Sequence, residues 1–146
     1  MTPEGPLVVE RRVSAPPSAV YAYLTDSERW ARWQGVDATI EARPGGLFRI
    51  LMPAGQTARG QFVELVPDRR VVFTWGFVDA PGIPPGSTTV EIDLIPEGDA
   101  TLVRLTHRGL RDEDVAIHRV GWEHYVPRLA AVASGADPGP DRGPGA

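Results

Sequence analysis

The sequence predicts an α+β fold in which a curved antiparallel sheet is wrapped around a long C-terminal helix, with two short helices after the first strand. Between residues 36 and 108, apolar and polar positions alternate in short segments separated by turns, and short connections favour antiparallel pairing. From residue 112 to about 134 the period changes to 3.6, which is typical of an amphipathic helix. A curved sheet and one helix bury their apolar faces on each other without filling all the space, so we expect a cavity between them.

The N-terminal part is expected to hold the first strand and both short helices. Residues 7–13 alternate weakly and are predicted to form a strand. Ser14 precedes a proline pair, and we expect it to cap a helix that begins at these prolines. Asp26 is expected to cap a second short helix over residues 27–33.

Turn residues divide the middle of the chain into six further segments with strand patterns. In the segment 57–66, either Phe62 with Glu64 or Val63 with Leu65 faces the interior, and the sequence leaves both alternatives open. A Glu64 that faced inward would need a charged partner. The predicted strands cover residues 36–41, 47–52, 57–66, 69–77, 87–95 and 100–108.

One folded unit is predicted, over residues 7–134, without an internal linker or repeat. Residues 1–6 are expected to be flexible. Residues 135–146 read GADPGPDRGPGA, and this glycine- and proline-rich composition predicts a disordered tail. The proline-rich loop 79–86 is interpreted either as a rim over the cavity or as a plain surface connection.

Composition limits the classes of function. The 146 residues include no cysteine, so we expect neither disulfides nor thiolate chemistry. No segment has the roughly 20 apolar residues of a membrane span, and no signal peptide is recognisable. We therefore expect a cytoplasmic protein without a membrane span.

Charge and histidine spacing narrow the partners further. The net charge is −4, and every basic side chain is a scattered arginine, so no basic stripe for nucleic acid is visible. The three histidines lack the spacing of metal ligands, and no glycine-rich phosphate or dinucleotide motif is present. We expect no metal, no cofactor and no nucleic acid, and leave a homodimer open.

Large apolar and aromatic side chains of the strands and the long helix are expected to line the cavity. His118, Trp122 and Tyr125 share the inner face of the helix and combine aromatic bodies with polar tips, a mixture that orients a mainly apolar ligand. The predicted ligand-binding residues are Trp30, Trp33, Phe48, Ile50, Met52, Phe73, Trp75, His107, His118, Trp122 and Tyr125.

Several short motifs follow one another in the order of a known superfamily. They are VSAPPSAV (13–20), LTD (24–26), WxxW (30–33), GGLF (45–48), GQFVELVP (60–67), RVVFTW (70–75), THRG (106–109) and HRVGWEHY (118–125). With these motifs the chain resembles the SRPBCC (START/polyketide cyclase-like) superfamily, within the group related to the C-terminal domain of the activator of the heat-shock-protein-90 ATPase. The resemblance implies the helix-grip fold and a ligand cavity, but no single reaction.

Three functions are compatible with these observations. The first is a non-enzymatic carrier or sensor of a small, mostly apolar molecule that is lipid-like, aromatic or polyketide-like. The second is a cyclase- or hydratase-type enzyme on a poly-carbonyl or aromatic substrate, with His118, Tyr125 and Glu64 as candidate catalytic groups. The third, from the resemblance, is a regulator of a chaperone ATPase, and we rank it last because that activator has a further N-terminal domain.

Overall fold

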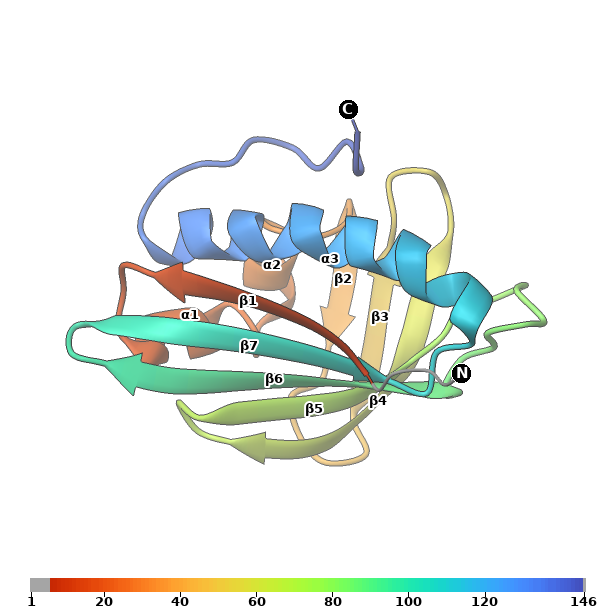
Figure 1. The fold of residues 1–146 in the computed structure, drawn as a ribbon, viewed down its shortest axis with the longest axis horizontal. Coiled ribbons are helices and arrows are strands. Elements are labelled where there is room, and N and C mark those ends of the chain that lie inside the picture. Colours follow the sequence, from red (N-terminus) through yellow and green to blue (C-terminus); the bar gives the residue numbers. More distant parts are fainter. Residues whose placement is uncertain (1–5, 146) are drawn as a thin grey trace.

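The computed structural model describes residues 6–145 and confirms the predicted order of elements. Seven antiparallel strands form one sheet in the order β1-β7-β6-β5-β4-β3-β2, which curves around helix α3 (Figure 1). Residues 1–5 of the expected flexible N-terminus lie outside the described part. The strands are β1 Leu7–Val13, β2 Asp37–Ile40, β3 Leu47–Leu51, β4 Thr57–Val66, β5 Arg70–Trp75, β6 Thr88–Glu97 and β7 Ala100–Arg108. The helices are α1 Pro17–Ala22, α2 Ser27–Trp30 and α3 Asp112–Ala133.

The two short helices begin in different ways. The Asp26 side chain accepts a hydrogen bond from the backbone N–H of Arg29 at 3.0 Å, which confirms the predicted cap of α2. The predicted Ser14 cap is wrong, because the residue that precedes α1 is Pro16 and no side chain caps this helix. The residue that precedes a proline disfavours helical backbone angles. Pro16 precedes Pro17, so Pro16 stays extended and the helix begins at Pro17.

A bulge in β4 resolves the two alternatives for its inward face. The pairing with β5 shifts between Phe62 and Glu64, so Val63 is an extra residue in this strand. The extra residue changes which positions face the core. Phe62 and Leu65 pack inward, whereas Val63 and Glu64 are exposed, so each alternative was right for one residue only.

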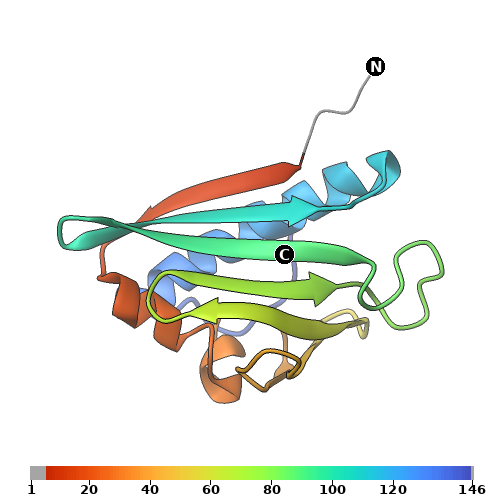
Figure 2. The same ribbon diagram turned by 90° about the horizontal axis from the view of Figure 1, so that it is seen from below.

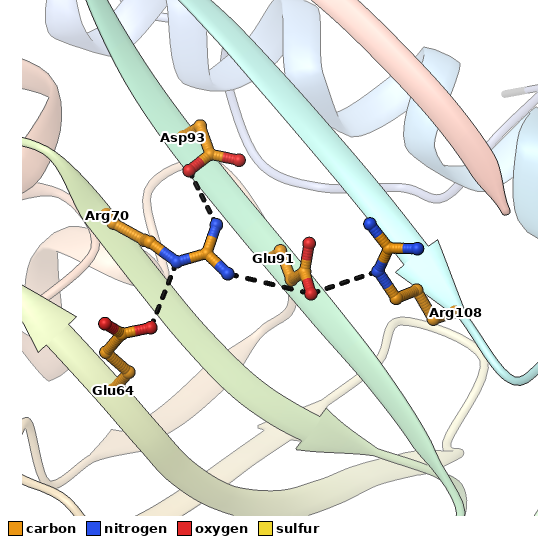
Figure 3. A network of polar contacts seen from close by, with 5 residues as sticks. All are labelled: Glu64, Arg70, Glu91, Asp93 and Arg108. Carbon is orange, nitrogen blue, oxygen red and sulfur yellow. Dashed lines mark hydrogen bonds and ion pairs between the residues drawn. The ribbon is translucent and has the colours of Figure 1, made fainter.

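Glu64 belongs to a network of charges on the outer face of the sheet (Figure 3). Arg70 lies 3.0 Å from Glu64, 2.7 Å from Asp93 and 3.7 Å from Glu91, and Arg108 lies 3.0 Å from Glu91. Figure 2 views this outer face, with α3 behind the strands. Because Glu64 does not face inward, the condition under which it would need a charged partner does not arise, and its pair with Arg70 is a surface pair of the kind that contributes at most about 1 kcal/mol.

The interior of the sheet contains a group of packed rings that we call the aromatic cluster. The Phe48 and Phe73 rings stack with centroids 4.2 Å apart, and Trp30 contacts both edge-on. These rings come from α2 and the turn after it, and from β3, β4 and β5, and therefore join the helical cap to the sheet. The members of the aromatic cluster, all at most 2% exposed, are Trp30, Trp33, Phe48, Phe62 and Phe73.

No helix within residues 6–145 combines the length and apolar character that crossing a membrane requires.

Candidate functional site

A cleft of about 410 Å³ lies against the inner face of α3, beside the aromatic cluster. The helix supplies one side, and the ends of β3 and β5 with their following loops supply the other. Its rim is apolar, since Ile117 and Val120 are 69% and 57% exposed. The lining residues are Gln34, Met52, Gln56, Trp75, Phe77, Ile117, His118, Val120, Gly121, Trp122, Tyr125 and Pro144.

Four rings form what we call the cleft wall: Trp75, Phe77, His118 and Trp122. The Trp75 indole N–H donates to Nε2 of His118 at 3.3 Å. Nδ1 of His118 lies 2.9 Å from the backbone carbonyl of Asp114, so Nδ1 carries the hydrogen and Nε2 accepts. Burial lowers the pKa of His118. Both ring nitrogens are therefore occupied in the neutral form.

His107 lies behind the cleft wall in a second chain of hydrogen bonds. The Trp122 indole N–H donates to its Nδ1 at 3.0 Å, which places the histidine hydrogen on Nε2. Nε2 lies 2.8 Å from the Thr88 hydroxyl, which in turn donates to the carbonyl of Trp75. Burial, with a contribution from nearby His118, lowers the pKa of His107 to about 3. His107 is thus a neutral residue that holds two elements of the core together.

Two polar side chains meet the cleft at its inner end. Gln34, 1% exposed, accepts the Trp30 indole N–H on Oε1 at 3.0 Å. Tyr125 is 3% exposed, and its hydroxyl has no hydrogen-bond partner within the described residues. Burial and the neighbouring Asp141 carboxylate raise the pKa of Tyr125. The inner end of the cleft is therefore polar but uncharged.

The C-terminal segment completes one side of the cleft, with Pro144 among the lining residues. The segment passes over α3 (Figure 1), and the disorder that its composition predicts stays a prediction. The buried Asp141 carboxylate accepts the backbone N–H of Gly35 at 2.7 Å. Arg128 donates to the carbonyls of Pro138 and Gly139, which ties the segment to the helix. These bonds place the segment beside the cleft.

The structure brings some of the predicted residues together and separates others. Glu64, a candidate catalytic group, lies on the outer face of the sheet, remote from His118 and Tyr125. His107 lies behind Trp122, outside the cleft. Those that line the cleft are Met52, Trp75, His118, Trp122 and Tyr125. Those buried in the core instead are Trp30, Trp33, Phe48, Ile50 and Phe73. Their role toward a ligand stays a prediction.

Sequence reasoning did not single out several residues of the cleft. Ile117 and Val120 lie beside the apolar stripe of the helix, and exposed apolar residues at that spacing were the available signal. Gln34 and Pro144 gave no signal, because their places depend on contacts distant in sequence. The residues not singled out are Gln34, Gln56, Phe77, Ile117, Val120, Gly121 and Pro144.

Comparison with protein families gives one match that spans most of the chain. The model described as Activator of Hsp90 ATPase homolog 1-like protein matches residues 14–134. The human protein Activator of 90 kDa heat shock protein ATPase homolog 1 is 27% identical over 109 residues, which are 75% of this chain and 31% of the human protein. The chain therefore spans about a third of the length of this curated relative.

Solved structures share the fold. An AHSA1-like protein from Rhizobium etli is 47% identical, with a TM-score of 0.70, and the match covers 94% of this chain and 88% of that protein. DynU16, a protein in the dynemicin biosynthetic locus, is 25% identical with a TM-score of 0.81, and the match covers 96% of this chain and 51% of that one.

Proposed function

This chain belongs to the family of Activator of Hsp90 ATPase homolog 1-like proteins, as its motifs indicated, and from that premise we propose that its cleft binds a small, mostly apolar molecule. The ligand is lipid-like, aromatic or polyketide-like, and the protein acts as a non-enzymatic carrier or sensor. A binding domain of this type is consistent with the family and with the fold that it shares with DynU16.

The observation that carries the proposal is a cleft of ligand size with mainly apolar walls. Its volume of about 410 Å³ falls in the range of small-molecule sites, about 300–1,000 Å³. An apolar molecule that entered it would remove from water both its own surface and the exposed side chains of Ile117 and Val120. Each Å² so buried contributes roughly 25 cal/mol before the costs of association.

The enzyme alternative has weaker support from the same geometry. A general base needs a free lone pair, and Nε2 of His118 already accepts the Trp75 N–H. Burial also lowers the pKa of His118, which fits a neutral structural ring. With Glu64 paired to Arg70 on the outer face, Tyr125 is the remaining candidate in the cleft. A tyrosine with a raised pKa is a poor base near neutral pH, which favours binding over turnover.

The chaperone alternative rests on the name of the human relative, and the matched region is 31% of that protein. A pull-down with purified Hsp90 tests it directly, with ATPase activity as the second readout. Retention of Hsp90 together with a change in its ATPase rate would replace the carrier proposal.

Gly121 offers a direct test of binding in the cleft. A Cβ added at this helical position meets no heavy atom within 4 Å, and Gly121 lines the cleft, so a larger side chain here would occupy space in the cleft. We expect wild-type protein to enhance and blue-shift the emission of the neutral apolar dye Prodan, and Gly121→Leu to abolish that change. Replacing glycine inside a helix also stabilises by about 0.5–1 kcal/mol, so loss of binding would not reflect unfolding.

Gly121→Ala is the matched control, because it gains the same helix stability but adds one methyl group only. It should bind Prodan nearly as well as wild type. Unchanged dye binding by Gly121→Leu, or no response of the dye to wild-type protein, would contradict the proposal. Light scattering on the same samples determines whether the protein is a homodimer.

A further inference from the structure

The cleft has a charge pattern that restricts what it can hold. None of its lining residues is Asp, Glu, Lys or Arg. Near Tyr125, the buried Asp141 carboxylate already accepts the backbone N–H of Gly35, and the half-buried Arg128 donates to backbone carbonyls of the C-terminal segment. A charged ligand would lose its hydration in the cleft without gaining an ion pair there. The part of the ligand inside the cleft is therefore uncharged.

The hydrogen-bonding groups of the cleft wall are already satisfied. Both indole N–H groups, of Trp75 and Trp122, donate to histidines. The His118 ring uses Nε2 to accept and Nδ1 to donate. A ligand can therefore meet these four rings by apolar and edge contacts alone, unless an existing bond breaks.

Gln34 is different because its amide has a fixed orientation and spare donors. Trp30 can only donate, so the bond at 3.0 Å assigns the facing atom of Gln34 as Oε1 and leaves its Nε2 hydrogens available. This is the single hydrogen bond of the Gln34 side chain within residues 6–145. Gln34 is 1% exposed and lines the cleft, so these hydrogens are available to a molecule in the cleft.

Tyr125 supplies a second, independent observation at the same end. Tyr125 is 3% exposed and lines the cleft, and its hydroxyl lies near the Asp141 carboxylate without forming a well-aligned hydrogen bond within the described residues. Leaving a buried polar group without a good hydrogen bond is unfavourable, so a ligand oxygen that accepts from this hydroxyl gains affinity.

We propose that the ligand of this cleft is an uncharged, largely apolar molecule with a hydrogen-bond-accepting oxygen, such as a ketone carbonyl, which accepts from Nε2 of Gln34 and from the hydroxyl of Tyr125. This inference rests on the proposed function and names the chemistry of the molecule bound. The apolar body of the ligand lies along the cleft wall, and its oxygen enters the inner end.

Three naphthalene probes test the acceptor requirement. They are 2-acetylnaphthalene, a neutral ketone; 2-isopropenylnaphthalene, of the same shape with CH2 in place of the oxygen; and 2-naphthoate, an anion. We expect the ketone to bind wild-type protein at least tenfold more tightly than the alkene and than the anion, by tryptophan fluorescence titration. In NMR spectra, the side-chain amide protons of Gln34 should shift with the ketone and not with the alkene.

Gln34→Glu, titrated at pH 9 so that the carboxyl is ionised, is the decisive variant, because a carboxylate oxygen still accepts the Trp30 N–H while both donors are lost. The tenfold ratio between the affinities for the ketone and for the alkene should fall toward one in this variant. Gln61→Glu makes the same chemical change on exposed β4, outside the cleft, and should keep the preference. Tyr125→Phe, which removes the hydroxyl alone, should reduce the preference severalfold.

The outcomes separate this inference from the proposed function. Equal binding of ketone and alkene by wild-type protein, with both lost in Gly121→Leu, would overturn the acceptor requirement and leave the apolar carrier intact. Anion binding as tight as that of the ketone would also overturn it. Binding of none of the three probes would contradict both proposals. Since the wild-type amide shifts need no variant, a misfolded Gln34→Glu would not remove the test.

Discussion

The aromatic cluster and the cleft wall lie side by side but are held in different ways. Phe48 links them, with its ring centroid 5.8 Å from that of Trp75. In the cluster, packing alone fixes the three phenylalanine rings, and the indole N–H groups of its two tryptophans bond to groups of the helical cap. In the cleft wall, one side of each ring faces the cleft, and indole N–H bonds to His107 and His118 replace the missing neighbours.

This difference shows how a cavity can persist in a small domain. A wall held only by dispersion contacts would tend to collapse into adjacent space, because protein interiors favour dense packing. Directional bonds from two indoles to two neutral histidines fix the ring planes instead. The cleft is thereby preformed, which lowers the ordering cost of binding an apolar molecule.

The largest effect is expected from truncation within the aromatic cluster. Phe73 is 0% exposed and contacts Trp30, Phe48 and Phe62. Phe73→Ala should lower the free energy of unfolding by about 3–5 kcal/mol, since it leaves a cavity that rigid neighbours cannot fill. Urea denaturation measures this value. A loss below about 1 kcal/mol would show that the cluster is not packed more firmly than the cleft wall.

An intermediate effect is expected from pH, through His107. Its folded pKa of about 3 lies below the ordinary value of 6.5, so between these values the unfolded chain binds a proton that the folded chain does not. Stability should therefore fall as the pH drops from about 6.5 toward 3, by about 2–3 kcal/mol at pH 4.5 relative to pH 7.5. Urea denaturation at the two pH values measures the change.

His107→Asn isolates this contribution from the titrating carboxylates. The asparagine oxygen can still accept from Trp122, but the side chain has no proton to gain. The variant should be less stable than wild type at pH 7.5 and lose about 2–3 kcal/mol less on acidification. An identical pH dependence in the two proteins would mean that His107 is not held neutral by its surroundings.

The smallest effect on stability is expected at the open side of the cleft. Phe77 is half-buried, contacts Trp75 edge-on and contacts His118 with tilted rings. Phe77→Ala should cost about 1 kcal/mol or less in the free energy of unfolding but weaken Prodan binding about five- to tenfold, because it removes ligand contact area. A stability loss as large as that of Phe73→Ala would abolish the distinction between the two regions.

The fold was largely predictable because local patterns encode it. Alternation with turn residues predicted the bounds of β1, β4 and β7 as the structure has them, and the change of period at residue 112 located the start of α3. The sequence predicted β5 and α2 to be longer than they are. The strand pattern and the helix pattern both continue into residues whose backbone forms turns instead.

The site was predictable only in part. Trp30 and Trp75 are equivalent as sequence signals, but one is enclosed by rings and the other faces the cleft. That difference arises from contacts between distant elements, which periodicity does not report. The Val63 bulge also gave no local signal, although this one inserted residue changes which side chains of β4 face the core. Asp141 gave none either, because its partner Gly35 is 106 positions away.

The course of the C-terminal segment has a practical consequence for protein production. With Pro144 in the wall of the cleft, any polypeptide joined after the last residues starts beside its entrance. A purification tag placed there would compete with soluble compounds for the entrance or alter their access. Compound screens on this protein are therefore better made with the tag at the other terminus or removed by protease.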